Sequence, residues 1–562
     1  MPKSIIREYE NSNRTLDLSA NFAVFVPGLA AIEDSSLMKE AEKAGIYYRD
    51  TNIYRLNNIN QFNKYIGLCK ISADHTVPET AKPEKVDASS DSELINNYKW
   101  IVYSYELDTW DEAEEKFYSV VEDTTTRPAT WSTTRRLYIE AKVEEADDSL
   151  VTHYYQLAEY SKEAMREYFA VDEHPKFISG LVKIKAGNEG VNIVDGEKHL
   201  GNKIAYELLN AGYTVYYKVL KNFDEEHPET TTVLAQLLDK DLWEPLKDKS
   251  TYRIRYITSG GCYNYNVYEL MAKVANFNNT VELADADTLE SATGRGDCIA
   301  LFDIDETGFN EALNTPSKVA TAFGAGAKAI SAKLGTAGKY CAIFAPRVVY
   351  AGENEDFDIK YPASFNYLLC AARSQENFAE WWAAAGYTRG ISYKTIEYTT
   401  YNFGDLLINT LAPRKGNNYT TVSINLILNE RGNYYLWGNR TALSLETDTD
   451  NLKFSHFLNI RQLCVTLKQT IYSATRQFTF DPNSDVLWIN FVNAIRPTLE
   501  KMKGDQGIAG YKISRVTTDK KAVMMAKIRI VPIEAVEDFD ISVYLEDSID
   551  GIVVNADETV AD

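Results

Sequence analysis

The stretch Ile424-Asn-Leu-Ile-Leu-Asn-Glu-Arg-Gly-Asn-Tyr-Tyr-Leu-Trp-Gly-Asn-Arg440 predicts a β-hairpin at the start of the C-terminal region. Its two apolar runs are separated by Glu430-Arg-Gly-Asn433, which has the composition of a turn. Downstream of the hairpin, the chain predicts two long helices and then two strands. No part of this region has the pattern of a reaction centre, so we expect a packed α+β domain.

Two segments after the hairpin have apolar residues at helical spacing. The first has seven such positions, three or four residues apart: Phe457, Ile460, Cys464, Leu467, Ile471, Ala474 and Phe478. Its polar face contains Arg461, Lys468 and Arg476. The second has the positions Trp488, Val492, Ile495, Leu499 and Met502, and Pro497 is expected to interrupt and kink it. We expect two helices packed on a sheet, with strands following at 526–532 and 541–546.

The region between residues 200 and 390 alternates strands with helices. The predicted strands 213–220, 298–303 and 340–345 are apolar or aromatic along most of their length. Helices are predicted at 267–277, 317–334 and 365–385. Strands that are apolar on both faces and alternate with helices are typical of a mostly parallel sheet covered on both sides. An earlier strand, Asn21-Phe-Ala-Val-Phe-Val-Pro-Gly28, is predicted to end in a Pro-Gly turn.

Residues 75–190 have a different character and predict a β-rich insertion. A polar linker at 71–97 precedes the strand-like segments 98–105, 136–143 and 151–157. The fold class is therefore a multidomain α/β and α+β chain. The predicted parts are an N-terminal arm (1–20), the first part of the core (21–74), the β-rich insertion (75–190), the α/β domain (191–413), the C-terminal α+β domain (414–535) and a C-terminal arm (536–562).

Composition excludes several classes of protein. The chain has 562 residues, 59 of them Lys or Arg and 81 Asp or Glu, so its net charge of −22 disfavours direct nucleic-acid binding. The N-terminus lacks the apolar segment of a signal peptide, and no apolar run reaches membrane-spanning length. The six cysteines are scattered without a CxxC pair, which favours free thiols in a reducing compartment over disulfides or metal.

One motif suggests an enzyme. The apolar strand Ile299-Ala-Leu-Phe-Asp303-Ile-Asp305-Glu-Thr307 has the Asp-x-Asp-x-Thr pattern of haloacid-dehalogenase-like phosphatases, in which the first Asp attacks phosphorus. The alternative is that these acids end a buried strand at the rim of the sheet. The other elements of a phosphatase site are missing, and the glycine-rich segments and isolated histidines fit neither a phosphate loop nor a metal site. We therefore predict a non-enzyme without a cofactor or metal.

The order of several landmarks resembles the contractile, myovirus-type bacteriophage tail sheath proteins. The C-terminal order of strand, Gly438-Asn-Arg440, two helices and closing strands is similar to the C-terminal domain of that family. Five upstream segments also resemble family landmarks: Asn21–Gly28, Leu208–Tyr217, Arg295–Asp305, Tyr340–Arg347 and Gly386–Gly390. The resemblance spans about 350 residues, roughly 1–70 and 200–550, and its order is more specific than any single motif. The insertion at 75–190 matches nothing in the family, whose insertions decorate the outside of the sheath.

The resemblance implies a mechanical function. Sheath subunits stack as hexameric rings in a helical lattice around a tail tube, and contraction drives the tube through the host envelope. The implied partners are other copies of the chain, the tube protein, and the baseplate and tail terminator proteins. The implied location is the virion tail, assembled in the bacterial cytoplasm without stable membrane insertion.

The resemblance also implies roles for particular residues. Arg461, Lys468 and Arg476 are candidates for contact with the tube, although an ordinary solvated face explains them equally well. The arms are expected to add strands to neighbouring subunits. The candidate arm residues are Ile5, Ile6, Tyr9, Ile541, Val543 and Leu545.

Three alternatives remain open at this point. The first is the sheath of a non-phage contractile injection system, since the same lattice serves both. The second is the phosphatase built on Asp303 and Asp305. The third is a receptor- or glycan-binding role for the Tyr-rich insertion alongside sheath function.

Overall fold

The computed structural model describes most of the chain outside its two ends and the insertion. The described residues are 22–32, 34–72, 84–87, 100–106, 135–144, 150–156, 193–195, 199–222, 228–277, 294–309, 313–352, 358–412, 420–445, 452–517 and 523–535. All six arm candidates lie outside these ranges, as does the strand predicted at 541–546. The roles of these six residues and the strand at 541–546 remain predictions.

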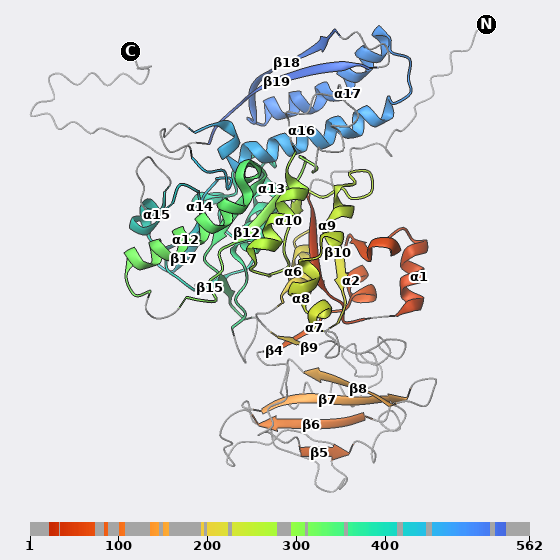
Figure 1. The fold of residues 1–562 in the computed structure, drawn as a ribbon, viewed down its shortest axis with the longest axis vertical. Coiled ribbons are helices and arrows are strands. Elements are labelled where there is room, and N and C mark those ends of the chain that lie inside the picture. The colour runs from red at the N-terminus through yellow and green to blue at the C-terminus, as the bar shows by residue number, and fades with distance from the viewer. Residues whose placement is uncertain are drawn as a thin grey trace, which may run out of the picture.

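A nine-stranded sheet forms the centre of the molecule (Figure 1). In spatial order the strands are β17 (Asn433–Trp437), β16 (Asn425–Glu430), β13 (Cys341–Ala345), β12 (Ile299–Asp303), β11 (Tyr256–Ile257), β1 (Ala23–Leu29), β10 (Thr214–Leu220), β3 (Ile53–Leu56) and β2 (Tyr47–Tyr48). Its six central strands, β16 to β10 in spatial order, are parallel, which confirms the expected mostly parallel α/β sheet. One antiparallel strand, β17, extends one end, and two strands, β3 and β2, extend the other.

Helices cover both faces of this sheet. Alternate residues of β12 enter opposite cores, with Phe302 on one face and Leu301 on the other. On the Phe302 face lie α8 (Val233–Leu237), α9 (Lys240–Trp243), α10 (Tyr265–Ala275), α12 (Pro316–Leu334) and α15 (Asp405–Leu411). On the Leu301 face lie α1 (Ser35–Lys43), α2 (Ile59–Tyr65), α6 (Gly201–Asn210) and α13 (Ala363–Asn377). The apolar strands predicted from sequence are apolar because both of their faces are buried.

Two predicted boundaries were wrong. Strand β1 continues through Pro27 and Gly28 to Leu29, because β10 pairs with its whole length. Helix α13 ends at Asn377, not near 385. The chain leaves the helix there because the indole N–H groups of Trp381 and Trp382 both donate to the carbonyl of Asp505 in the C-terminal region.

The C-terminal region forms a second layered unit. Helices α16 (Leu458–Gln477) and α17 (Asp485–Gly504) pack with a two-stranded sheet, β18 (Ile508–Val516) and β19 (Met525–Pro532), seen at the top of Figure 1. They share a core that includes Leu463, Phe491 and Ile495. Pro497 lies on the exposed side of α17, and the helix continues to Gly504, so the expected interruption is absent.

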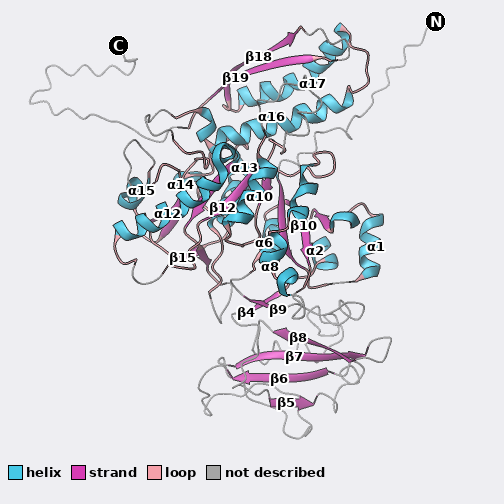
Figure 2. Ribbon diagram, viewed as in Figure 1, coloured by secondary structure: helices cyan, strands magenta, loops and turns pink. Residues whose placement is uncertain are grey.

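The strands predicted in the insertion are also present. They form an antiparallel sheet in the order β5 (Glu84–Asp87), β6 (Trp100–Glu106), β7 (Arg135–Glu144) and β8 (Leu150–Gln156), at the bottom of Figure 2. Two short parallel strands, β4 (Lys70–Ser72) and β9 (Ile193–Asp195), join the two ends of the insertion. The remaining short elements are β14 (Val348–Tyr350) paired with β15 (Ile396–Thr399), and helices α7 (Pro228–Thr231) and α14 (Gly386–Arg389).

Candidate assembly interface

The β18–β19 hairpin is a sheet of only two strands, so each strand has one outer edge. Within the described residues, no other strand pairs with either outer edge. The two strands are nine and eight residues long, and their register places Ile513 opposite Ile528. Long unpaired edges are templates for an added strand, and proteins usually shorten or cover them. The hairpin therefore has the geometry of a strand acceptor.

The two faces of the hairpin differ in chemistry. Tyr511, Ile513, Ile528 and Ile530 face the helices and pack against the core of the C-terminal unit. The opposite face is solvent-exposed and basic, because Lys512 lies directly opposite Arg529 and Lys527 lies opposite Ser514. Val516, Met525 and Val531 are also exposed large apolar residues.

A groove of about 660 Å³ runs between β18 and α17. Its lining is apolar at Trp488, Val492 and Ile513, and it also contains the charged side chains Arg496, Glu500 and Lys503. Glu500 accepts a hydrogen bond from the Tyr511 hydroxyl, which helps hold β18 over the helix. An extended strand paired with the free edge of β18 would lie over this groove.

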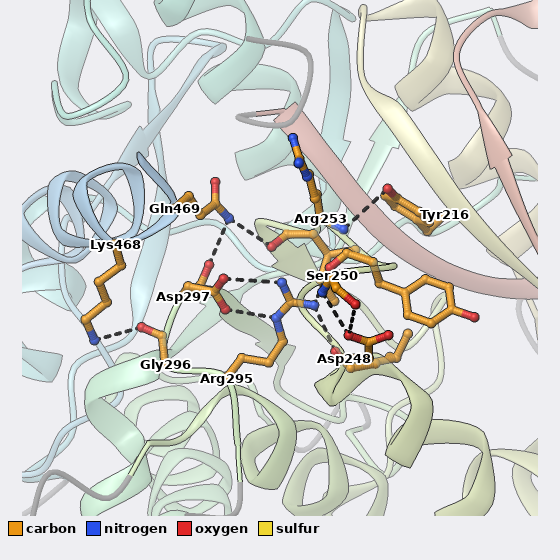
Figure 3. A network of polar contacts seen from close by, with 12 residues as sticks. Tyr216, Asp248, Ser250, Arg253, Arg295, Gly296, Asp297, Lys468 and Gln469 are labelled. Atoms are coloured by element: carbon orange, nitrogen blue, oxygen red, sulfur yellow. Dashed lines mark hydrogen bonds and ion pairs between the residues drawn. The ribbon is translucent and has the colours of Figure 1, made fainter. Parts of the chain in front are cut away.

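Helix α16 fixes the C-terminal unit to the large sheet through a network of polar contacts (Figure 3). The Gln469 amide donates to the carbonyls of Ile254 and Asp297, at 3.1 and 3.0 Å. The Lys468 ammonium donates to the Gly296 carbonyl at 2.8 Å. These carbonyls immediately precede β11 and β12, so α16 caps the N-terminal ends of the parallel strands.

A buried arginine adds a second attachment. Arg255, fully buried just before β11, donates to the Thr466 hydroxyl at 2.8 Å and the Gln462 carbonyl at 3.1 Å, both on α16. The Glu380 carboxylate lies 3.5 Å from the Arg255 guanidinium and accepts from the Thr466 hydroxyl at 2.7 Å. Sequence reasoning missed this group. The one available signal was an arginine between the apolar residues Ile254 and Tyr256.

The three proposed tube-contact residues have different surroundings. Arg476 is exposed near the end of α16, where its guanidinium donates to the Tyr472 hydroxyl at 3.2 Å. The Arg461 guanidinium lies 4.5 Å from the centre of the Tyr340 ring. Lys468 is half-buried, and burial, with Arg461 nearby, lowers the pKa of its ammonium to about 8. Contact with a tube remains a prediction for all three, and Arg476 is the most accessible.

The Asp303 carboxylate, the candidate phosphatase nucleophile, is buried and engaged by the start of α13. Its Oδ1 accepts from the Ser364 backbone N–H at 2.7 Å, and its Oδ2 accepts from the Ser364 hydroxyl at 2.5 Å. Burial raises the pKa of Asp303 to about 7, although the bonds from Ser364 oppose this shift. Asp305 accepts from the backbone N–H and hydroxyl of Thr307 in a local turn. Each carboxylate therefore accepts two hydrogen bonds from a single neighbouring residue.

The described residues contain no cluster of three or more His, Cys, Asp or Glu side chains suited to a metal ion. All six cysteines are free, and Cys69, Cys298, Cys341 and Cys370 are buried. In the described part of the chain, no helix combines the length and apolar character needed to cross a bilayer.

Comparisons with known proteins gave matches only among solved structures. No protein-family model and no curated protein matches the chain. A chain of the anti-feeding prophage baseplate matches at TM-score 0.40 and 15% identity, covering 62% of this chain and 80% of its own. The contracted sheath complex of the PVC extracellular contractile injection system matches at TM-score 0.39 and 15% identity. The match covers 66% of this chain and 85% of the matched chain.

A sheath tail protein from Desulfitobacterium hafniense matches over more of the chain. It covers 91% of this chain and 96% of its own, at TM-score 0.33 and 9% identity. TM-scores below 0.5 describe a partial likeness of fold, so none of these alignments assigns a function. These three structures are a baseplate, a contracted sheath complex and a sheath tail protein.

Proposed function

We propose that this chain is the structural subunit of a contractile sheath that polymerises around an inner tube. The observation on which this proposal rests is the β18–β19 hairpin, whose two outer edges have no partner strand among the described residues. The order of sequence landmarks, which resembles the tail sheath family, supports it independently. In this proposal, subunits form stacked hexameric rings, and contraction of the lattice drives the tube through an envelope.

The hairpin would join subunits by strand addition. Backbone hydrogen bonds to an incoming strand supply affinity, and alternate side chains supply specificity. The chain contains two terminal segments proposed for this role, 1–20 and 536–562, and within the second the residues 541–546 alternate between apolar and polar side chains. In the proposed lattice, these arms of neighbouring copies occupy the two edges of the hairpin. The interface to the large sheet through α16 would then transmit force between the arms and the α/β core.

Other parts of the proposal follow from the family resemblance. A phage tail is the proposed setting, with the tube, baseplate and terminator proteins as partners, and a non-phage injection system is the alternative. Arg476, with Arg461 and Lys468, is the proposed contact with the tube. A phosphatase remains the alternative of another class, but the buried Asp303, with both oxygens bonded to Ser364, does not favour it.

The decisive experiment is negative-stain electron microscopy of the purified protein with its tube protein. We expect striated cylinders from the full chain and none after deletion of residues 1–20 or 536–562. The far-ultraviolet circular dichroism and thermal transition of each deleted protein are compared with those of the full chain, so that loss of cylinders is separated from loss of folding. Monodisperse subunits under all conditions would refute the sheath proposal.

A parallel assay separates the enzymatic alternative. Hydrolysis of p-nitrophenyl phosphate with Mg²⁺ is measured for the full chain and for Asp303→Asn. The sheath proposal predicts no turnover by either protein. Turnover that Asp303→Asn abolishes would instead establish the phosphatase.

A further inference from the structure

Three basic side chains surround the ring of Tyr340, the residue directly before β13. The Arg461 guanidinium carbon lies 4.5 Å from the centre of this ring, the Lys468 ammonium 5.2 Å and the Lys339 ammonium 5.4 Å. Arg461 and Lys468 belong to α16, whereas Lys339 belongs to the short 3₁₀ helix Gly335–Tyr340. Two separate elements of the fold therefore bring three cations together at one place.

This cluster has no counterion in the part of the chain that the structure describes. The ion pairs found among the described residues include none of Arg461, Lys468 and Lys339. The carboxylate that acts on Lys468 is that of Asp297, which is already paired with Arg295 at 2.9 Å. The buried Nε of Arg461 also has no hydrogen-bond partner among the described residues. The cluster is therefore an uncompensated positive site on a chain whose net charge is −22.

The pKa values of the two lysines reflect this uncompensated charge. Burial lowers the pKa of the Lys468 ammonium to about 8, and the nearby Arg461 and Lys249 contribute to the shift. Burial also lowers the pKa of Lys339, and Arg461 adds to that shift. Attraction to the Tyr340 ring offsets only part of the repulsion, because cation–π contacts are weak at sites open to water. An anion held between the three side chains would remove it.

The donors in the cluster match a tetrahedral oxyanion. A guanidinium presents a planar fork of N–H groups that fits two oxygens of a phosphate, and an ammonium adds a compact charge. The Lys468 ammonium donates to the Gly296 carbonyl at 2.8 Å and the Tyr340 hydroxyl at 3.5 Å, which positions it and leaves its third N–H free to donate (Figure 3). Arg461, Lys468 and Lys339 are each partly exposed, so a small anion can reach them. Three positive charges favour a dianion over chloride.

We propose that Arg461, Lys468 and Lys339 form a binding site for a phosphate-type oxyanion, either inorganic phosphate or the phosphoryl group of a small ligand. This inference does not depend on the sheath proposal, because the site lies within one subunit. A bound dianion neutralises two of the three residues proposed to contact the tube and leaves Arg476 as the available cation. It also links α16 to the segment that enters β13, which strengthens the attachment of the C-terminal unit to the large sheet.

Isothermal titration calorimetry of the full-length protein with inorganic phosphate tests the site. Ionic strength is kept low and constant with chloride, because salt screens exposed charges. Lys339→Met and Arg461→Met should each weaken binding on the order of tenfold, since each removes one charge-assisted contact. Arg461→Lys should recover part of the affinity, because it restores the charge without the planar fork. The control Lys512→Met removes one of two directly opposed cations on the β18–β19 hairpin and should bind phosphate like the wild type.

Glycerol 3-phosphate distinguishes the two sources of the anion. Affinity comparable to that of inorganic phosphate assigns the site to the phosphoryl group of a larger ligand. Much weaker binding of the ester assigns it to the free anion. Either result supports the inference.

Thermal unfolding separates anion binding from a merely structural role of the cluster. Phosphate should raise the unfolding temperature of the wild type and have little effect on Lys339→Met, because a ligand stabilises only the form that binds it. Without phosphate, Lys339→Met should be at least as stable as the wild type, because it relieves repulsion.

Two results would overturn the inference. One is lower stability of Lys339→Met than of the wild type in both buffers, which would show a structural role alone. The other is absence of phosphate binding by wild-type protein that circular dichroism shows to be folded. If Lys339→Met then also lost the cylinders formed with the tube protein, the cluster would be assigned to the tube contact. The sheath proposal is tested separately, by cylinder formation of the wild type.

Discussion

Replacing Asp303 with asparagine should remove a pH dependence of stability that this buried carboxyl imposes on the chain. Asp303 ends β12 and receives two hydrogen bonds from Ser364 at the start of α13. Asparagine has the same shape. Its carbonyl oxygen can still accept from the Ser364 N–H, and its amide can donate to the Ser364 hydroxyl. The substitution therefore removes the ionisation and preserves the contacts.

The magnitude follows from the raised pKa. Burial raises the pKa of Asp303 from 3.8 to about 7, with Glu306 adding to the shift and Arg347 opposing it. The folded chain therefore holds this proton more tightly than the unfolded chain, and the stability gained from protonation is lost as pH rises from about 4 to 7. Three pKa units correspond to about 4 kcal/mol over the full range. Between pH 5 and 8, about 2.7 kcal/mol of this should be observed.

The assay is urea unfolding of both proteins at several pH values, followed by circular dichroism. Titrating groups that do not interact with Asp303 are present in both proteins, so their contributions cancel in the difference. The unfolding free energy of the wild type should fall relative to Asp303→Asn by about 2.7 kcal/mol from pH 5 to 8. Parallel pH profiles would refute the assignment of a raised pKa to Asp303 and the burial argument behind it.

Two further substitutions test the packing of the core. A Cβ at Gly201, the first residue of α6, would lie 1.9 Å from the Pro27 carbonyl oxygen, so Gly201→Ala should lower the unfolding free energy by at least about 3 kcal/mol. Gly404→Ala, which meets no atom within 4 Å, is the control, and equal effects in urea titrations would contradict the steric argument. Glu380→Gln removes the charge that offsets buried Arg255 and should cost about 3 kcal/mol. A double variant, Arg255→Met with Glu380→Met, should be less destabilised than the sum of its single changes, and additive costs would show that the two groups are not coupled.

The sequence was sufficient for most elements and insufficient for their contacts. The strand at 298–303 and the helix at 317–334 were predicted nearly to their observed ends, because their apolar patterns are long and their flanking residues are typical of ends. The end of α13 was missed, because Trp381 and Trp382 bond to Asp505, more than 120 residues away. Pro497 was expected to interrupt its helix, but it lies on the exposed side of α17, where a helix tolerates it.

The candidate assembly interface was likewise only partly predictable from the sequence. The alternation of Lys527 and Arg529 with Ile528 and Ile530 is visible in sequence and predicts a strand with one basic face. The opposition of Lys512 to Arg529 is not visible, because it depends on the register between two strands. Likewise, Lys468 was predicted either to contact the tube or to lie on a solvated face, and the structure shows that it donates to the Gly296 carbonyl at the base of the sheet. Hydrophobic periodicity shows which face of a helix is apolar but not which distant carbonyls its polar face meets.

By itself, the sequence indicated the alternation of strands and helices between residues 200 and 390, the two C-terminal helices and the parallel character of the central sheet, but it did not indicate strand β18. These features follow from local periodicity and from apolar strands that must be covered on both faces. Only the tertiary structure decided that α16 caps the N-terminal ends of the parallel strands and that β18 and β19 have no third strand beside them among the described residues. Both depend on pairings between residues far apart in the chain, whose geometry is set by packing of the whole molecule and leaves no local pattern in the sequence.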